Sequence, residues 1–350
     1  MGMSSASRLP SRAATLQSVA DAAGVHRSTA ARALNTATSH LISAEVVARV
    51  RDEARRLGYR RDVLAASLRT GRSRLVGVVL PDLANPVFAP ILGGIEGELA
   101  KRGYSALVAH GPVDQERQIG IVEQLVARRV DGLILATAHR DDPVVAACLD
   151  AGTPVVLVNR AEDATRAPTV VSDDAGGMRL AVRHLVGLGH ARIGHLAGPA
   201  DLSTGIMRRR GFEAAMREAG LDPSRVAVAG AYSREAGEAA AAELLGQGPL
   251  DAIVAANDLL ALGAYQALAA RGLACPADVS IVGHNDMPLV DLVAPPLTTV
   301  RIDHLAMGQE AARLVVASIE EGLEEPLIRI TEPRLIVRAS TAAPQRSRTP

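Results

Sequence analysis

Arg27, Ser28 and Arg32 lie within six residues of one another, and their side chains suit the edges of nucleic-acid bases. An arginine guanidinium donates two parallel hydrogen bonds to the O6 and N7 acceptors of guanine, and a serine hydroxyl both donates and accepts. Because Ser28 and Arg32 are four residues apart, a helix places them on one face. The spacing predicts a helix that presents these groups to DNA.

Two short helices joined by a tight turn are predicted to hold these side chains, over residues 15–34, TLQSVADAAGVHRSTAARAL. Thr15 is expected to act as the first N-cap, because its hydroxyl can accept an otherwise unsatisfied amide hydrogen. Gly24 can take the left-handed conformation that the turn requires. The apolar stripe of the first helix is Leu16, Val19, Ala20 and Ala23. The pattern is typical of a helix-turn-helix, and an ordinary helical hairpin is the alternative.

A third helix is predicted within residues 42–59, ISAEVVARVRDEARRLGY. Ser43 is the expected N-cap, and Gly58 is the expected stop. One face of this helix carries Val46, Val47, Val50, Ala54 and Leu57. This face would close a small three-helix core.

Charge is divided unevenly along the chain. Residues 1–74 contain 13 arginines and 5 acidic residues, whereas the remainder contains 25 basic and 33 acidic residues. The formal net charge of the whole chain is zero. A basic N-terminal part joined to an acidic body indicates that only the N-terminal part meets phosphates.

The composition is that of a soluble intracellular protein of more than one domain, with 48% hydrophobic residues in 350. The sequence has no apolar run near the roughly 20 residues needed to cross a bilayer, and its N-terminus does not read as a secretion signal. Cys148 and Cys275 lack metal-ligand spacing and are expected to be free thiols. We therefore expect a cytoplasmic, nucleoid-associated protein with no metal and no cofactor.

Beyond residue 75, short aliphatic runs alternate with helix-length segments. This alternation predicts an α/β fold with parallel sheets covered on both faces, and the length suits two such domains. The candidate strands are LVGVVL, SALVAH, DGLILA, PVVLVN, RIGHLA, VAVAG, DAIVAA and VSIVG.

An enzyme on a doubly wound fold is the alternative of another class. The glycine pattern at residues 93–97 lies inside a probable helix, which is the wrong setting for a dinucleotide site, and the sequence has no Gly-x-Ser-x-Gly elbow. Structural roles are expected for His184, His190, His195 and His284. A secreted solute-binding protein would carry a signal peptide and no DNA-binding head. We therefore expect a protein that is not an enzyme.

The order of motifs resembles the lactose-repressor and galactose-repressor (LacI/GalR) family of bacterial transcription regulators. A helix-turn-helix is followed by a third helix ending in LGY, then by AASLRTGRS and a strand. The resemblance runs from about Thr15 to Thr341. Later stretches carry it in the same order: VDGLIL, HLVGLGHARIGHLAGP, RRRGFEAAM, AANDLLALGAYQAL, DVSIVGHND and PPLTTVRID.

The resemblance implies a helix-turn-helix head and a two-lobed core like that of periplasmic binding proteins. The implied domains are a disordered arm (1–14), the head (15–60), a hinge (61–74), an effector-binding core (75–341) and a disordered tail (342–350). Lobe 1 would comprise about 75–160 and 298–322, and lobe 2 about 161–297 and 323–341.

The family pattern also assigns the DNA-contacting residues. Relatives usually have proline and asparagine where this chain has Arg61 and Asp62, Ala66 replaces a common arginine, and His26 takes the place of the usual serine cap. Asp62 near phosphate would be unfavourable, so weaker or shifted hinge docking is expected. In the family, the equivalent of Leu68 wedges into the central base step. The DNA-binding residues implied are Thr15, Arg27, Ser28, Thr29, Arg32, Asn35, Ala65, Leu68 and Arg69.

Effector-binding positions follow from the same resemblance. They are Asn85, Phe88, Asn159, Arg208, Asn257 and Asn285, while Asp258 is expected to cap the helix that follows it. Phe88 has two open alternatives, stacking on a ligand or packing in the core. Many relatives have aspartates where this chain has Asn159 and Asn285. An amide offers one donor and one acceptor where a carboxylate only accepts, so this change alters which ligand face is satisfied.

The partners implied are a pseudo-palindromic double-stranded DNA operator, a second copy of the chain and a small-molecule effector, a sugar or sugar derivative. Repression is the family's usual outcome. No heptad pattern follows Thr341, so we expect a homodimer without an added tetramer-forming helix.

Overall fold

The computed structural model describes residues 14–35, 38–59, 71–111, 114–323 and 325–344. It divides into two compact units, residues 1–73 and 74–350. The first unit is helical, and its core joins residues of all three α-helices. Its elements are α1 (Leu16–Ala22), α2 (Arg27–Ala33), the 3-10 helix η1 (Ser39–Leu41) and α3 (Ala44–Arg56).

Local signals in the sequence set the ends of these helices. The Thr15 side chain caps α1 in a reciprocal capping box with Ser18. Gly24 and Gly58 have φ angles of 63° and 64°, a left-handed conformation that glycine adopts without steric cost. Both predicted turns are confirmed. Ser43 is the N-cap of α3, as predicted, but its side chain makes no capping hydrogen bond.

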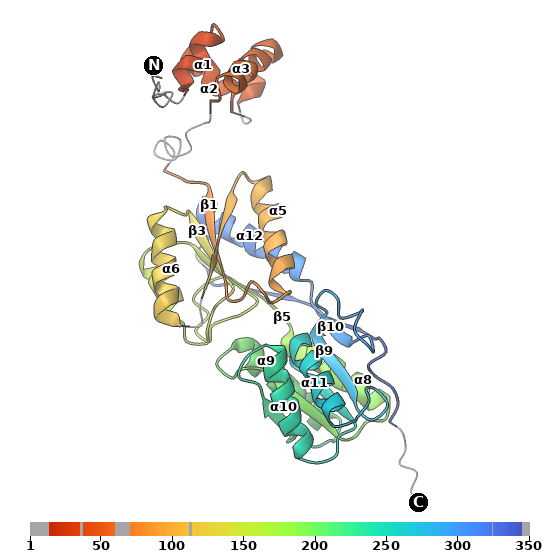
Figure 1. Cartoon of the computed structure of the whole chain (residues 1–350). Helices are drawn as coiled ribbons and strands as arrows, with labels where there is room; N and C mark the ends of the chain where they lie inside the picture. The colour runs from red at the N-terminus through yellow and green to blue at the C-terminus, as the bar shows by residue number, and fades with distance from the viewer. Residues whose placement is uncertain (1–13, 36–37, 60–70, 112–113, 324, 345–350) are drawn as a thin grey trace, which may run out of the picture. The chain divides into compact units, whose positions relative to one another are not determined.

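The second unit contains two six-stranded sheets (Figure 1). The first has the order β11-β5-β4-β3-β1-β2 and the second β12-β10-β9-β8-β6-β7. The strands of the first are β1 (Leu75–Leu80), β2 (Ser105–His110), β3 (Gly132–Leu135), β4 (Val155–Val158), β5 (Thr169–Ser172) and β11 (Ile328–Thr331). Those of the second are β6 (Ile193–Ala197), β7 (Val226–Val228), β8 (Ala252–Ala255), β9 (Ser280–Asn285), β10 (Thr298–Arg301) and β12 (Arg334–Ile336). All strand pairs are parallel except β10 with β12, and the predicted α/β class is confirmed.

The chain crosses between the lobes at residues other than those predicted. β5, assigned from the sequence to lobe 2, pairs with β4 and β11 in the first sheet. β10, assigned to lobe 1, pairs with β9 in the second sheet. β11, also assigned to lobe 2, lies in the first sheet as well. The predicted boundaries at 160, 298 and 323 are therefore wrong, because strand pairing places β5 and β11 in lobe 1 and β10 in lobe 2.

Helices cover both faces of each sheet. The helices of lobe 1 are α5 (Phe88–Lys101), α6 (Gln115–Ala127), α7 (Pro143–Asp150) and α12 (His304–Glu321). Those of lobe 2 are α8 (Asp174–Gly187), α9 (Ser203–Glu218), α10 (Arg234–Gly246) and α11 (Asp258–Ala270). In lobe 1, α6 and α7 share a core on one face, while α5 packs beside α12 from the far end of the sequence (Figure 1). α8 and α9 share a separate core on one face of the second sheet.

The C-terminal segment docks on lobe 2 further than predicted. The Ala342 amide donates to Ser280 Oγ at 3.1 Å, and the Ala342 carbonyl accepts from His190 Nε2 at 2.8 Å. The predicted start of the disordered tail, at residue 342, is therefore wrong, because that residue is hydrogen-bonded to lobe 2. Of the helices in the described residues, none has the length and apolarity needed to cross a membrane.

Candidate nucleic-acid interface and effector site

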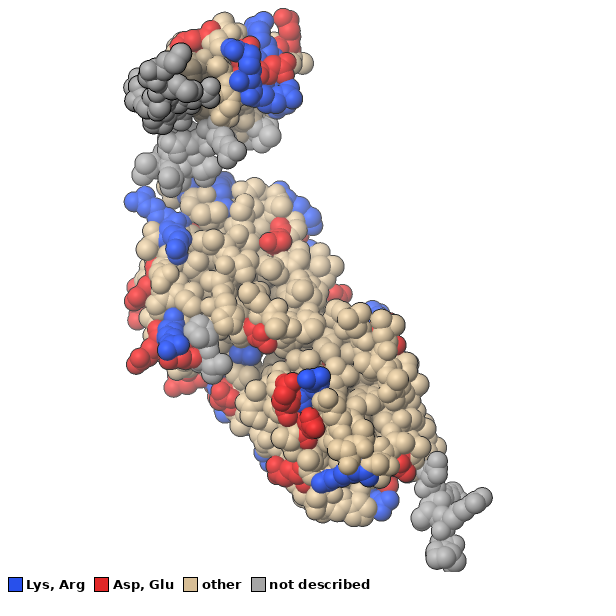
Figure 2. All heavy atoms as spheres, viewed as in Figure 1, with Lys and Arg blue, Asp and Glu red and all other residues tan. Residues whose placement is uncertain are grey.

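The predicted DNA-contacting side chains of the helical unit lie on or next to α2. Arg27, Ser28 and Arg32 are exposed, and Thr29 and Asn35 are half-buried. Figure 2 shows arginine atoms gathered on the surface of this unit, with fewer carboxylates among them. The exposed set can therefore donate to and accept from base edges, as the sequence predicted.

His26 caps α2 through one ring nitrogen. Its Nδ1 accepts from the Ser28 amide at 3.3 Å and lies 2.8 Å from the Ser28 hydroxyl oxygen. An imidazole nitrogen that accepts carries no proton, so the other nitrogen, Nε2, carries the hydrogen. The cap thus fixes the tautomer of an exposed histidine at the start of α2.

The predicted hinge contacts lie outside the described residues. These are Ala65, Leu68 and Arg69, together with the departures at Arg61, Asp62 and Ala66. They stay predictions from the sequence.

Arg208, predicted to face the effector, lies buried in lobe 2. Its Nε donates to Asp174 Oδ1 at 2.9 Å, and its Nη1 donates to the carbonyl of Ala256 at 2.6 Å. His284 Nε2 lies 3.5 Å from the same carboxylate oxygen. Burial favours the neutral acid, but Arg208 and His284 outweigh it and keep the pKa of Asp174 below its ordinary value. Arg208 is therefore the centre of a charged cluster, with its orientation fixed by protein groups.

Asn257, and not Asp258, caps the helix that begins at these two residues. Asn257 is the N-cap of α11, and its Oδ1 accepts from the Leu260 amide at 2.9 Å. Asp258 instead accepts from the Thr299 hydroxyl at 2.5 Å and from the Met287 amide at 2.8 Å. Burial raises the pKa of Asp258 to about 7. The expectation that Asp258 caps the helix is wrong, because its side chain reaches across to β10 instead.

Asn159 and Asn285 lie at the carboxyl ends of strands in different lobes. Both have positive φ angles, 67° and 115°, and asparagine tolerates this region better than most residues. Asn159 follows β4 and is half-buried, while Asn285 ends β9 and is buried. Open α/β sheets bind ligands at such strand ends. The backbone conformation therefore accounts for asparagine at both positions, and the ligand role stays a prediction.

The other two predicted effector residues form the entry to α5. Asn85 Oδ1 accepts from the Val87 amide at 3.3 Å, which closes a turn. Phe88 is the first residue of α5, is 3% exposed and belongs to the hydrophobic core. Of the two alternatives for Phe88, the structure shows core packing.

Three side chains that the sequence analysis missed link the lobes to this cluster. Tyr232 OH donates to Thr204 Oγ1 at 3.2 Å, and the guanidinium of Arg208 lies 6.0 Å from the centre of the Tyr232 ring. Arg160 follows Asn159 at the end of β4, and burial lowers the pKa of its guanidinium. The next amide, of Ala161, donates to Ser203 Oγ of lobe 2 at 2.9 Å. The rarity of aromatic residues, 2% of the chain, was the signal that could have drawn attention to Tyr232.

Asp286 is the residue after Asn285, and neighbouring segments of lobe 2 bind it. Its carboxylate accepts from Arg301 Nε and from Arg338 Nη2, the latter at 2.7 Å. Thr299 Oγ1 accepts from the Asp286 amide at 3.3 Å. These contacts fix the backbone that presents Asn285.

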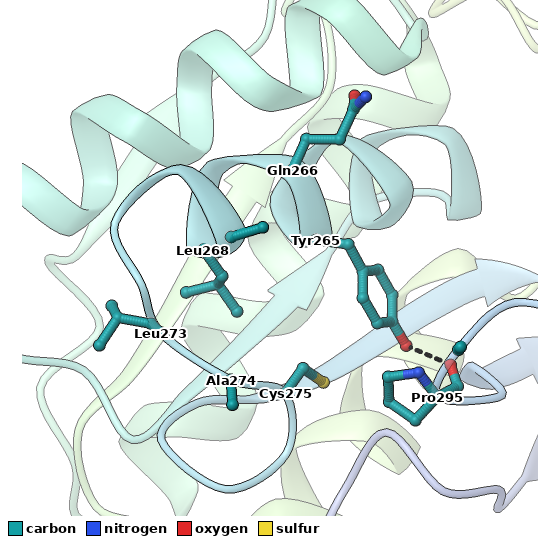
Figure 3. Close-up of a pocket in the computed structure, with 9 residues that line it drawn as sticks. Tyr265, Gln266, Leu268, Leu273, Ala274, Cys275 and Pro295 are labelled. Atoms are coloured by element: carbon teal, nitrogen blue, oxygen red, sulfur yellow. Dashed lines mark hydrogen bonds between the residues drawn. The ribbon is translucent and has the colours of Figure 1, made fainter.

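A separate groove of about 410 Å³ lies at the end of α11 (Figure 3). Tyr265 OH donates to the Pro295 carbonyl at 2.9 Å, and Gln266 points away from the other labelled side chains. The remaining lining is mostly apolar and includes Leu268, Leu273 and Cys275. This groove holds none of the predicted effector residues.

The interlobe residues together offer amides, hydroxyls, guanidinium groups and one aromatic ring. Such a set has the chemistry to hydrogen-bond a polyhydroxylated ligand and to stack on its apolar face. Among the described residues, no group of three or more His, Cys, Asp and Glu is placed to hold a metal ion.

Comparison with known proteins agrees with this architecture. Residues 73–338 match the family of periplasmic binding proteins and sugar binding domain of LacI family. The HTH-type transcriptional regulator CelR of Thermobifida fusca is 35% identical over 340 residues, covering 94% of this chain and 98% of that protein.

Two solved structures show the same similarity over the whole architecture. A CelR–cellobiose complex is 33% identical with a TM-score of 0.72, over 93% of this chain and 99% of that one. The Lac repressor dimer bound to operator and the anti-inducer ONPF is 29% identical with a TM-score of 0.83, over 95% of this chain and 100% of that one.

Proposed function

The chain belongs to the LacI family of transcriptional regulators, and on that premise we propose that it is a DNA-binding repressor controlled by a small-molecule effector. The observation that carries the proposal is the set of exposed side chains suited to base edges, Arg27 and Ser28 at the start of α2 and Arg32 in its last turn. The basic excess of residues 1–74 supplies the attraction to phosphates.

The protein binds a pseudo-palindromic operator as a homodimer. Two copies place two recognition helices in successive major-groove segments, so the symmetry of the site mirrors that of the protein. Arg27 and Arg32 read guanine edges, and Ser28 adapts to its partner. Thr15, Thr29 and Asn35 position the helix on the backbone, while Ala65, Leu68 and Arg69 serve the hinge. The Lac repressor structure named above, a dimer on its operator, supports this arrangement.

The effector is a sugar or sugar derivative held between the lobes. Asn159 and Arg160 approach it from lobe 1, and Thr204, Tyr232 and Asn285 from lobe 2. Asn85, Arg208 and Asn257 shape the site by fixing turns and the buried ion pair, and Phe88 supports it from the core. The cellobiose in the CelR complex supports a carbohydrate class. The effector controls transcription only if it binds the DNA-competent and released states with different affinity.

The test of DNA binding is selection of genomic fragments by the purified protein across a salt series. We expect recovery of one pseudo-palindromic motif, with affinity that falls steeply as salt rises. Binding of all fragments alike would reject sequence-specific recognition. No binding at any salt would reject the regulator itself.

The test of effector control uses the recovered operator. Sugars and sugar derivatives are added to the protein–operator complex, and fluorescence anisotropy follows the release or retention of the DNA. We expect at least one of them to shift the operator Kd. A sugar that raises the melting temperature of the protein without changing its operator Kd would show ligand binding without allosteric control.

A further inference from the structure

We propose that the effector carries a negative charge, as a sugar carboxylate or a sugar phosphate, and that Arg160 binds that charge. The inference rests on the proposed function, because it concerns the same interlobe site. It distinguishes the effector of this chain from a neutral sugar by its chemical class.

Arg160 is placed at the centre of the interlobe contact. It lies two residues beyond β4, and its amide donates to the Val158 carbonyl at 2.8 Å. The following amide, of Ala161, is held by Ser203 at the start of α9. Thr204, the next residue of that helix, accepts from Tyr232. The backbone at Arg160 is therefore held next to the start of α9 in lobe 2.

The guanidinium of Arg160 has no carboxylate partner within the described part of the chain. Its electrostatic neighbours are Tyr232 and Asp201, and neither forms an ion pair or hydrogen bond with it. Asp201 lies 3.7 Å from His139 instead, and its side chain is 62% exposed. Burial lowers the pKa of Arg160, so the surroundings do not compensate the lost hydration of its charge.

The carboxylates of the lobe 2 cluster are each occupied by protein groups. Asp174 is bound by Arg208, and Asp258 by the Thr299 hydroxyl and the Met287 amide. Asp286 is bound by two arginines, Arg301 and Arg338. None of the three is left to neutralise Arg160.

The two strand ends that approach this region carry amides. Asn159 adjoins Arg160, and Asn285 lies at the corresponding strand end of lobe 2. An aspartate at either position would have offered a negative charge. The rings of His284 and His304, beside the Arg208–Asp174 pair, are uncharged at neutral pH, because burial lowers the pKa of each to about 4. Arg160 therefore keeps a positive charge that no carboxylate of the described residues pairs with.

A partly buried guanidinium without a counter-ion has lost part of its hydration, and a ligand anion compensates for this loss on binding. A carboxylate or phosphate also matches the planar fork of arginine through two parallel hydrogen bonds. A neutral hydroxyl accepts one such bond and leaves the charge uncompensated. The excess charge therefore selects an acidic ligand.

The experiment measures matched ligands by titration calorimetry on the full-length protein without DNA. The probes are glucose, gluconate, glucuronate and glucose 6-phosphate, and cellobiose with cellobionate. We expect an acidic member to bind about tenfold or more tightly than its neutral counterpart, since hydrogen bonds to charged groups exceed neutral ones. The carboxylate and phosphate arms identify which anion the site takes.

Variants assign the preference to one side chain. Arg160→Gln should bring the ratio of the neutral Kd to the acidic Kd down to about one. Arg160→Lys should retain part of the preference for the acid, because it keeps the charge. Arg209→Gln removes an exposed arginine of α9 that pairs with Glu213, and it should leave the ratio unchanged. If Arg160→Gln does not fold, the wild-type ratio and the Arg160→Lys ratio still test the proposal.

The proposal is overturned if a neutral probe binds at least as tightly as its acids, if no acid binds, or if Arg160→Gln keeps the full preference. Operator binding is measured in parallel without ligand. Sequence-specific DNA binding together with a neutral preference rejects only the charge of the effector. An acid preference without sequence-specific DNA binding rejects only the regulator.

Discussion

Asn159 and Asn285 occupy corresponding positions in the two lobes. Each lies at the carboxyl end of the third strand of its sheet, β4 in the order β11-β5-β4 and β9 in the order β12-β10-β9. Each also has a positive φ angle. The two lobes thus place an asparagine with a positive φ angle at corresponding strand ends, and this backbone conformation gives asparagine a reason to stand there that is independent of any ligand.

Asn159→Ala is expected to destabilise the protein by about 1–2 kcal/mol, because alanine has a steric cost in the left-handed region. Asn159→Gly should be nearly neutral for stability while removing the amide from the effector site. Urea unfolding of both variants measures the difference. Equal stability of the alanine variant and the wild type would show that the turn relaxes.

Gly94→Ala is expected to destabilise lobe 1 by about 1–3 kcal/mol, because a Cβ there would overlap the Leu305 carbonyl where α5 meets α12. Gly93→Ala is the matched control, since a Cβ at that position meets nothing within 4 Å. The control should be neutral or stabilising by up to about 1 kcal/mol, as alanine favours a helix over glycine. Thermal unfolding of the pair separates helix packing from propensity, and similar effects at the two positions would contradict the close approach.

Asp174→Asn is expected to cost about 3–5 kcal/mol, because it leaves the Arg208 guanidinium buried without its counter-ion. The double variant Asp174→Asn with Arg208→Met should lose less than the sum of the single variants, since it removes both charges. Denaturant unfolding of the full cycle measures the coupling. Additive losses would mean that the two side chains do not depend on one another.

The three-helix unit could be predicted almost residue by residue because its signals are local. Thr15, Gly24 and Gly58 act within one turn of their own positions. The lobe crossings could not be predicted, because the aliphatic residues of β5 suit either sheet and its pairing with β11 joins residues about 160 positions apart.

The effector site could be predicted only in part for the same reason. Its strand-end asparagines and Arg208 could be found because they belong to local sequence motifs. The contacts within the site could not be predicted, because they involve residues remote in sequence. Arg208 is paired with Asp174, 34 positions away, and Asp258 with Thr299, 41 positions away. Such pairs leave no local pattern, which is why the contacts of Asp258 could not be predicted.

The free energy of unfolding is expected to fall on acidification, and His195 contributes to this fall because its ring takes up a proton when the protein unfolds. His195 Nδ1 donates to the Val254 carbonyl at 2.8 Å, and burial lowers the pKa of the ring to about 4 in the folded state. The unfolded ring, with a pKa of about 6.5, binds a proton that the folded ring excludes. Its contribution is therefore present above about pH 6.5 and is lost as the pH falls toward 4.

The size of this effect follows from the two pKa values. Between pH 7 and pH 5, the wild type should lose about 2 kcal/mol more than His195→Gln, which cannot take up the proton. Urea unfolding at both pH values gives the comparison. His40→Gln, at an exposed position, should follow the wild type, and a parallel loss in His195→Gln would assign the pH dependence to other groups.

Arg32→Ala is expected to reduce the preference for the operator over a scrambled duplex while sparing effector binding by the core. The reason is that Arg32 is exposed on α2, where a guanidinium reads a guanine edge worth about 1–3 kcal/mol. Arg55→Ala removes the same charge from the exposed face of α3, where the side chain pairs with Asp52, and should keep the preference. Fluorescence anisotropy with both duplexes at several salt concentrations separates the two variants. If Arg32→Ala keeps the full preference, α2 reads DNA in a different register and Arg27 becomes the side chain that carries the specificity.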